Sequence, residues 1–156
     1  ISPSDYPAIG ALGQVTYGLL REMGFNVDLQ ESDWGTVVQR RAKHDPVEHG
    51  GWSILHTTSN SSLNANPAVS SFVRGLGEKG WFGWWKSEAA EALVQDWLHA
   101  PGAAEQRAAA VALSRMVMEG VGTIPLGEFF VRTAFSKDIS GIRQAPWPYP
   151  WTVRRG

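Results

Sequence analysis

Residues 25–56 read FNVDLQESDWGTVVQRRAKHDPVEHGGWSILH, and the order of patterns in this stretch decides the fold class. Apolar and polar residues alternate over 25–30, which predicts a strand. The apolar run 52–56 is short and favours β-structure, so it predicts a second, buried strand. Because two strands that enclose a helix usually lie parallel in one sheet, the stretch predicts an α/β fold.

The helix between these strands is expected to begin at Ser32 or Asp33, since either side chain can cap a helix N-terminus. Its inner face is expected to consist of Trp34, Val37, Val38 and Ala42. Arg40, Arg41 and Lys43 lie near its end, where positive charge is favoured by the helix dipole. The dipole therefore accounts for all three cations.

Upstream, the apolar spacing over residues 8–23 predicts another helix, which Gly24 would end. Residues 2–5 are expected to form a loop after a strand that precedes Ile1, with the chain a processed form or a piece of a longer protein. The expected order is helix, strand, helix, strand. This order predicts an α/β fold with a mixed or parallel sheet and flanking helices.

The polar, uncharged loop 57–67, TTSNSSLNANP, directly follows the second predicted strand. In open α/β sheets, ligands bind at the carboxyl ends of the strands. The position of this loop in the predicted topology therefore makes it a candidate binding site.

Helices are predicted over 88–98 and 103–120, and strands over 123–126 and 129–135. Ala89, Leu93 and Trp97 are expected on the inner face of the first of these helices, and Ala109, Leu113, Met116 and Val117 on that of the second. The segment 145–151, APWPYPW, is too rich in proline for a helix or a central strand, and it is expected to be extended.

The segment 80–86, GWFGWWK, concentrates four aromatic residues: Trp81, Phe82, Trp84 and Trp85. Outside a helix, consecutive side chains point in different directions, and Gly80 and Gly83 permit sharp turns. We therefore expect some of these rings to pack in the core, as Trp34 and Trp97 should on their helices. At least one of Trp81, Trp84 and Trp85 is expected to face a ligand, because tryptophan gives a broad, stiff contact surface.

The composition argues against several functions. The net charge is −1 and there is no basic stripe, so nucleic acid and anionic membranes are poor partners. No apolar run is long enough for a membrane span, and the absence of cysteine excludes disulfides and thiol chemistry.

The histidines and the loop serines raise the alternatives of a metal site and a hydrolase site. His44, His49 and His56 lie near Asp45 and Glu48, but Pro46 and Gly50 interrupt any metal-binding spacing on one helix face. No Gly-x-Ser-x-Gly motif surrounds the loop serines. We therefore expect no metal, no cofactor and no catalytic residues.

Three segments together resemble one protein family: NVDLQESDWGTVVQRRAKHDPVEHGGWSILHT (26–57), GWFGWWKSEAAEALVQDWLHAP (80–101) and IPLGEFFVRTAFSKDISGI (124–142). Their order and spacing are similar to the later half of the extracytoplasmic solute-binding proteins of peptide/nickel-type ABC importers, called family 5. The resemblance covers nearly the whole chain.

This resemblance implies one lobe of a type II periplasmic-binding-protein fold. Residues 1–142 would form an incomplete second, C-terminal lobe, and residues 143–156 would return toward a first lobe outside this chain. Such proteins are binders, not enzymes; they trap a peptide or other small polar solute between two lobes and deliver it to the membrane subunits of a permease. They work in the periplasm or as membrane-tethered lipoproteins. The alternative is a ligand-sensing module on the same fold without transport.

The resemblance also implies which residues line the cleft: Trp52, His56, Thr57, Thr58, Ser59 and Asn60. Peptide-binding members often carry an aspartate in this region that pairs with the peptide α-amine. No Asp or Glu occurs between Glu48 and Glu78 in this chain. Because a buried ammonium needs a carboxylate partner, binding of a peptide through its amine would require an acid from elsewhere.

Overall fold

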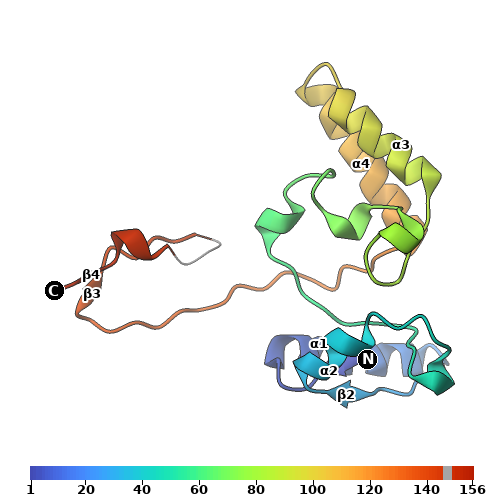
Figure 1. Cartoon of the computed structure of the whole chain (residues 1–156), viewed down its shortest axis with the longest axis horizontal. Helices are drawn as coiled ribbons and strands as arrows, with labels where there is room; N and C mark the ends of the chain where they lie inside the picture. Colours follow the sequence, from blue (N-terminus) through green and yellow to red (C-terminus); the bar gives the residue numbers. More distant parts are fainter. Residues whose placement is uncertain (146–148) are drawn as a thin grey trace. The chain divides into compact units, whose positions relative to one another are not determined.

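The computed structural model describes residues 1–145 and 149–156 and divides into two compact units (Figure 1). Unit 1 comprises Ile1–Ser59 and Gly77–Trp85, and unit 2 comprises Asn60–Leu76 and Lys86–Gly156. Each unit has its own buried apolar side chains. These are Ile9 and Val37 in unit 1, and Ala90, Val94, Leu113 and Val117 in unit 2.

Unit 1 is built on a short parallel sheet. Strand β1 (Ser2–Pro3) pairs with β2 (Glu31–Ser32), with Ser2 opposite Glu31. On the other side of β1, Ile1 donates to the carbonyl of Ile54 (2.6 Å) and accepts from the amide of His56 (3.0 Å). These two bonds are those of a parallel pair centred on Ile1 and Leu55, so β1 lies between two parallel neighbours. Helices combined with parallel pairing confirm the α/β class.

The strand boundaries differ from the predictions. Residues 25–30 and 52–56 are not strands, while Ser2–Pro3, expected to be a loop, forms β1. A strand is defined by hydrogen bonds to a neighbour, and β1 is only two residues long. It therefore engages only the end of each predicted strand, through Gln30 and Glu31–Ser32 on one side and residues 54–56 on the other.

Helix α1 (Pro7–Glu22) packs closely on β1 because two of its residues lack side chains. A Cβ on Gly10 would stand 2.9 Å from the carbonyl oxygen of Pro3, and one on Gly13 would collide with the hydroxyl of Ser2. After α1, Gly24 adopts φ +90°, which confirms the predicted stop.

Helix α2 (Trp34–Arg40) is capped by Asp33, whose carboxylate accepts from the amide of Thr36 at 3.0 Å. This hydrogen bond identifies Asp33 as the cap and confirms one of the two predicted alternatives. Val37 is fully buried, but Ala42 is exposed. The prediction for Ala42 is wrong because the helix ends two residues before it.

A tight turn closes unit 1 after α2. It contains the 3₁₀ helix η1 (Val47–His49), and Gly50 follows with φ +96°. Arg40 fastens this turn, since its guanidinium donates to the carbonyls of Gly50 (2.9 Å) and Gly51 (2.8 Å) and to the side chain of Gln30. The short helix η4 (Gly77–Lys79) leads into the aromatic segment.

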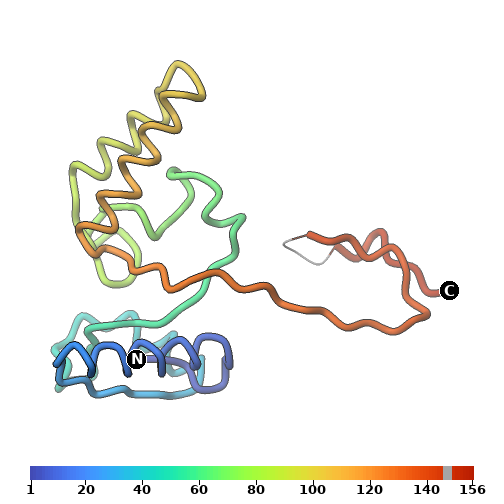
Figure 2. Tube along the Cα trace, turned by 180° about the vertical axis from the view of Figure 1, so that it is seen from behind, coloured from blue at the N-terminus to red at the C-terminus, as the bar shows by residue number. Residues whose placement is uncertain are grey.

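In unit 2, helices α3 (Glu88–His99) and α4 (Ala103–Glu119) lie side by side and antiparallel (Figure 2). Both helices confirm the predicted ranges within about two residues. Leu113 and Val117 are buried, as predicted, with Ala109 and Met116 half-buried. On α3 the buried residues are Ala90 and Val94, so the assignment of Ala89 to the inner face is wrong. The helix is rotated by one residue from that prediction.

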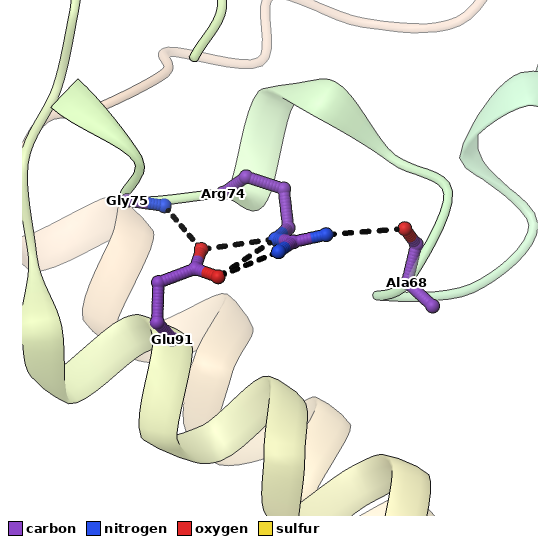
Figure 3. Close-up of polar contacts among 4 residues, drawn as sticks. All are labelled: Ala68, Arg74, Gly75 and Glu91. Atoms are coloured by element: carbon purple, nitrogen blue, oxygen red, sulfur yellow. Dashed lines mark hydrogen bonds and ion pairs between the residues drawn. The ribbon is translucent and has the colours of Figure 1, made fainter. Parts of the chain in front are cut away.

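The loop before α3 contains the 3₁₀ helices η2 (Ser61–Asn64) and η3 (Ser71–Val73). A half-buried ion pair fixes it to α3, as Figure 3 shows. Arg74 donates to both carboxylate oxygens of Glu91, at 2.6–3.1 Å, and to the carbonyl of Ala68 (3.3 Å). The carboxylate also accepts from the amide of Gly75 at 2.8 Å.

Ser87 caps α3, and its removal gives a first stability prediction. Its hydroxyl accepts from the amide of Ala90 at 3.1 Å. We expect Ser87→Ala to lower the free energy of unfolding by about 1 kcal/mol, measured by urea denaturation, because that amide loses its partner. Ser114→Ala is the control, since Ser114 is exposed and its hydroxyl bonds only the carbonyl of Ala110. Equal effects from both variants would contradict the assignment of the cap.

No strand forms over 123–126 or 129–135, so both strand predictions are wrong. Among the described residues no backbone hydrogen bond joins this segment to another, although the hydroxyl of Thr123 donates to the carbonyl of Phe72 (2.9 Å), and Pro125 offers no amide hydrogen. Its apolar side chains are exposed, including Phe130 (87%) and Val131 (80%). The end of the chain forms an antiparallel hairpin from β3 (Ile139–Ser140) and β4 (Arg154–Arg155), joined through η5 (Pro150–Thr152). Of the segment 145–151, which was expected to be extended, residues 146–148 lie outside the described residues. For Pro150 and Trp151 the expectation is wrong, because a single 3₁₀ turn (η5) tolerates proline at its first position.

Candidate ligand-binding site

All the predicted ligand-binding residues except Asn60 lie in unit 1. They come from the segment that runs beside β1, the loop after it, and the aromatic segment. Trp52, Trp81, Trp84 and Trp85 are all half-buried, so each ring is partly packed and partly open to solvent.

The aromatic segment folds as a turn that depends on its glycine. The amide of Trp84 donates to the carbonyl of Trp81 (2.9 Å), Gly83 adopts φ +100°, and Trp84 itself has φ +52°. A second bond, from the amide of Gly77 to the carbonyl of Trp85 (2.9 Å), closes the base of this turn. The backbone thus directs the rings of Trp81 and Trp84 to different neighbours.

Trp84 packs between His44 and Trp52. The His44 ring is stacked on it with a centroid separation of 3.3 Å, and the Trp52 ring lies 6.0 Å away at 37°. His44 also faces Glu78, with Nε2 and a carboxylate oxygen 3.7 Å apart. The structure therefore brings two of the predicted residues, Trp52 and Trp84, into contact.

Trp81 and Phe82 belong to a second group, centred on Arg41. Their rings meet edge to face at 5.0 Å. The Arg41 guanidinium lies over Phe82 at 4.5 Å, over Trp81 at 5.3 Å and over Trp34 at 5.9 Å. Such contacts are attractive because each ring presents a negative face to the cation.

Trp52 connects the two groups. Its indole nitrogen donates to the backbone carbonyl of Arg41 at 3.2 Å. Through this bond Trp52 holds the residue after α2 while its ring contacts Trp84. One predicted ligand residue is thus a structural support for its neighbours.

A cavity of about 180 Å³ lies inside unit 1, lined by α1 and by residues of the segments 27–30 and 51–56. Trp52 and His56 line it, together with mostly apolar side chains. His56 is buried, and burial lowers the pKa of its ring, so the ring is neutral at physiological pH. Its Nδ1 and the hydroxyl of Ser2 are buried without a hydrogen-bond partner among the described residues.

The hydroxyl-rich residues after the strand-like segment are accessible. Thr57 is half-buried, while Thr58 and Ser59 are exposed. Asn60 begins the next unit, where its side chain accepts from the amide of Ser62 (2.9 Å) and caps η2. Asn60 therefore has a local structural role in unit 2.

Metal ligation has no support in the part of the chain that the structure describes. There, no three His, Asp or Glu side chains gather in a way that could hold a metal ion. Across the described ranges, no helix combines the length and apolar character needed to cross a bilayer.

The main residue that the sequence-based prediction missed is Arg41. Adjacent Arg40 and Arg41 were both assigned to the helix dipole. In the structure, the guanidinium of Arg40 is fully used in the turn, whereas the side chain of Arg41 makes no hydrogen bond or ion pair among the described residues. Its proximity to the aromatic segment could not be read from the sequence because the two are about 40 residues apart.

These features define an α/β unit with a parallel sheet and an aromatic, hydroxyl-rich surface. No family model matches the chain. Over 155 residues, 99% of this chain, it is 35% identical to a probable peptide ABC transporter periplasmic-binding protein, y4tO, of Sinorhizobium fredii (strain NBRC 101917 / NGR234). The chain spans 29% of the length of that relative. The resemblance to solute-binding proteins of ABC transporters is thereby confirmed.

Proposed function

We propose that this chain is part of the substrate-binding component of an ABC importer and is not an enzyme. The component captures a peptide or other small polar solute between two lobes and delivers it to the permease subunits in the membrane. In this proposal it works outside the cytoplasm, in the periplasm or as a tethered lipoprotein. The single observation that carries it is the 35% identity, over nearly the whole chain, to a periplasmic-binding protein.

Within this proposal, residues 1–142 contribute the second lobe and residues 143–156 return toward the first lobe. The topology of unit 1 supports a binding role, since Thr57–Ser59 follow the segment paired with β1 at its carboxyl end. This is the edge at which parallel sheets bind ligands. Closure of the lobes on the solute would then select the form that the permease recognises.

The solute-facing residues in this proposal are Trp52, His56, Thr57, Thr58, Ser59, Asn60, Trp81, Trp84 and Trp85. Aromatic surface would supply most of the affinity, and the hydroxyl and amide groups would orient the solute. Among the described residues, Trp85 forms no ring contact with another aromatic side chain, which distinguishes it from Trp81 and Trp84.

Trp85 and Trp84 are therefore expected to respond differently to replacement. We expect Trp85→Ala to weaken solute binding by about 10-fold or more, with a small change in Tm, because its ring is available to a ligand. We expect Trp84→Ala to lower Tm clearly, because it removes the packing between His44 and Trp52. Calorimetric titration and thermal unfolding of the full-length protein measure both effects. Unchanged affinity in Trp85→Ala would remove that residue from the site.

The function itself is tested by native mass spectrometry of the full-length protein, purified without denaturation. A co-purified small mass that leaves on denaturation identifies the class of solute and supports import. A solute-free protein that binds no peptide or sugar would contradict the proposal.

A further inference from the structure

Arg41 is a half-buried cation that has no anionic partner within residues 1–145 and 149–156. Among the described residues, the ion pairs are those of Arg74 with Glu91 and Arg155 with Asp138, and His44 lies 3.7 Å from a carboxylate oxygen of Glu78. None of these contacts involves Arg41, and its Nε atom is buried with no hydrogen-bond acceptor in the part of the chain that the structure describes. A buried donor on a charged group that lacks an acceptor is costly, so such groups normally have a partner.

The surroundings of Arg41 restrict what this partner can be. The rings of Trp34, Trp81 and Phe82 lie 4.5–5.9 Å from the guanidinium carbon and occupy space over its flat face. The N–H groups of a guanidinium lie in its plane and point outward from its edge. A partner can therefore reach the guanidinium of Arg41 only at its edge, by accepting hydrogen bonds from its N–H groups.

A carboxylate fits this arrangement best. It is planar, it carries a single charge, and its two oxygens match two parallel N–H groups of an arginine. A phosphate group carries more charge and would call for a second cation. The neighbouring Arg40 cannot supply one, because its guanidinium is committed to Gln30, Gly50 and Gly51.

We propose that Arg41 binds a carboxylate group of the captured solute, between the aromatic rings of unit 1. This inference rests on the proposed function and goes beyond it by assigning a charged contact. Two predicted solute-facing residues lie next to Arg41, which is consistent with this inference. Trp52 donates a hydrogen bond to its backbone carbonyl, and the ring of Trp81 contacts its guanidinium. The aromatic rings would exclude water and strengthen the ion pair.

The test uses trialanine and its C-terminal amide as probes, with calorimetric titration of the full-length protein. The two peptides differ only in the carboxylate. We expect the wild type to bind trialanine at least about 10-fold more tightly than the amide, as for hydrogen bonds between charged groups. In Arg41→Gln this preference should disappear, and in Arg41→Lys, which keeps the charge but not the planar fork, it should be partly retained.

Arg21→Gln is the matched control. Arg21 lies in the same unit and also contacts one ring, that of Tyr17, with 5.8 Å between its guanidinium carbon and the ring centre. The control therefore removes the same charge and one cation–π contact, and it should keep the full preference for the carboxylate. Loss of the preference in both variants would overturn the inference, because net charge would then explain it.

Other outcomes separate the inference from the proposed function. Equal binding of both peptides by the wild type, or a preference that survives Arg41→Gln, overturns the inference and leaves the importer role intact. A co-purified solute without a carboxylate does the same. If Arg41→Gln instead lowers the Tm of the solute-free protein far more than Arg21→Gln and leaves the preference unchanged, the carboxylate belongs to the protein itself. If neither peptide binds and no solute co-purifies, the proposed function fails and the inference fails with it.

Discussion

Replacing Gly51 with alanine is expected to destabilise the protein by about 3–4 kcal/mol, among the larger effects of single substitutions. Gly51 is buried in the turn after α2. A Cβ there would overlap the carbonyl group of Asp45 and stand 3.0 Å from the carbonyl oxygen of Pro46. Both obstacles are backbone atoms, so the clash cannot be relieved by moving a side chain.

The turn would have to open to accommodate the methyl group, and the hydrogen bonds that hold the turn together would then be lost. The carbonyl of Gly51 accepts from Arg40 at 2.8 Å, and its amide donates to Pro46 at 3.0 Å. Because residue 52 follows directly, the displacement would also move Trp52. We therefore expect weaker solute binding together with the loss of stability.

Gly18→Ala is the control for this substitution. Gly18 lies within α1 in the same unit, and a Cβ there would meet no atom within 4 Å. Alanine is the better helix former, so this variant should be about 0.5–1 kcal/mol more stable than the wild type. Urea denaturation of both variants measures the contrast, and similar effects would contradict the account of the turn.

The second large effect is expected from Glu91→Gln, at about 2 kcal/mol of destabilisation. Glutamine can still accept from the amide of Gly75, but it cannot accept the paired hydrogen bonds of Arg74 (Figure 3). The glutamine oxygen at the Oε1 position can keep the bond from Nε of Arg74, but the amide NH₂ in place of Oε2 leaves Nη2 facing a donor, without its acceptor at 2.6 Å. Truncating one partner leaves the other charge half-buried and unpaired, which is the main source of the cost.

The same ion pair makes stability depend on pH. The hydrogen bonds from Arg74 hold the pKa of Glu91 below its ordinary value of 4.5. A carboxylate whose pKa is lowered by folding stabilises the folded state above its unfolded pKa, and this contribution is lost as the pH falls through the folded value. The stability gap between wild type and Glu91→Gln should therefore be full at neutral pH and shrink below about pH 4.

Arg155→Gln provides the comparison with an exposed pair. Arg155 and Asp138 are 3.0 Å apart, but the Arg155 side chain is 86% exposed, against 23% for Arg74. Exposed pairs contribute little because water screens them. A loss in Arg155→Gln as large as that in Glu91→Gln would show that burial is not what gives the Arg74 pair its strength.

The sequence predicted the helices well because the signals for helices are local. Apolar spacing defined α1, α3 and α4, and Gly24 and Asp33 marked an end and a beginning. Strands were predicted poorly because they depend on a distant partner. The alternation over 25–30 and the β-favouring residues over 129–135 are real, but such patterns create a strand only where another segment supplies hydrogen bonds.

Part of the candidate site could also be predicted from local sequence patterns. Glycine and tryptophan in GWFGWWK indicated a turn that presents rings, and Gly83 does adopt a positive φ. The grouping of those rings with His44, Trp52 and Arg41 depends on the tertiary fold. Two adjacent arginines have equivalent sequence contexts, so only the structure could show that the side chain of Arg40 is committed to the turn, while the buried Nε of Arg41 has no acceptor among the described residues.

The aromatic cluster of unit 1 also serves as an internal optical reporter. Of the eight tryptophans in the chain, five lie in that unit: Trp34, Trp52, Trp81, Trp84 and Trp85. Intrinsic fluorescence from this chain is therefore weighted toward unit 1, which carries the surface that we propose for solute capture. The ring centres of Trp52 and Trp84, 6.0 Å apart, are also close enough for their electronic transitions to couple in circular dichroism. Binding of a solute to the proposed surface should thus change the fluorescence and the circular dichroism of these tryptophans, so it can be followed in real time without attaching a dye.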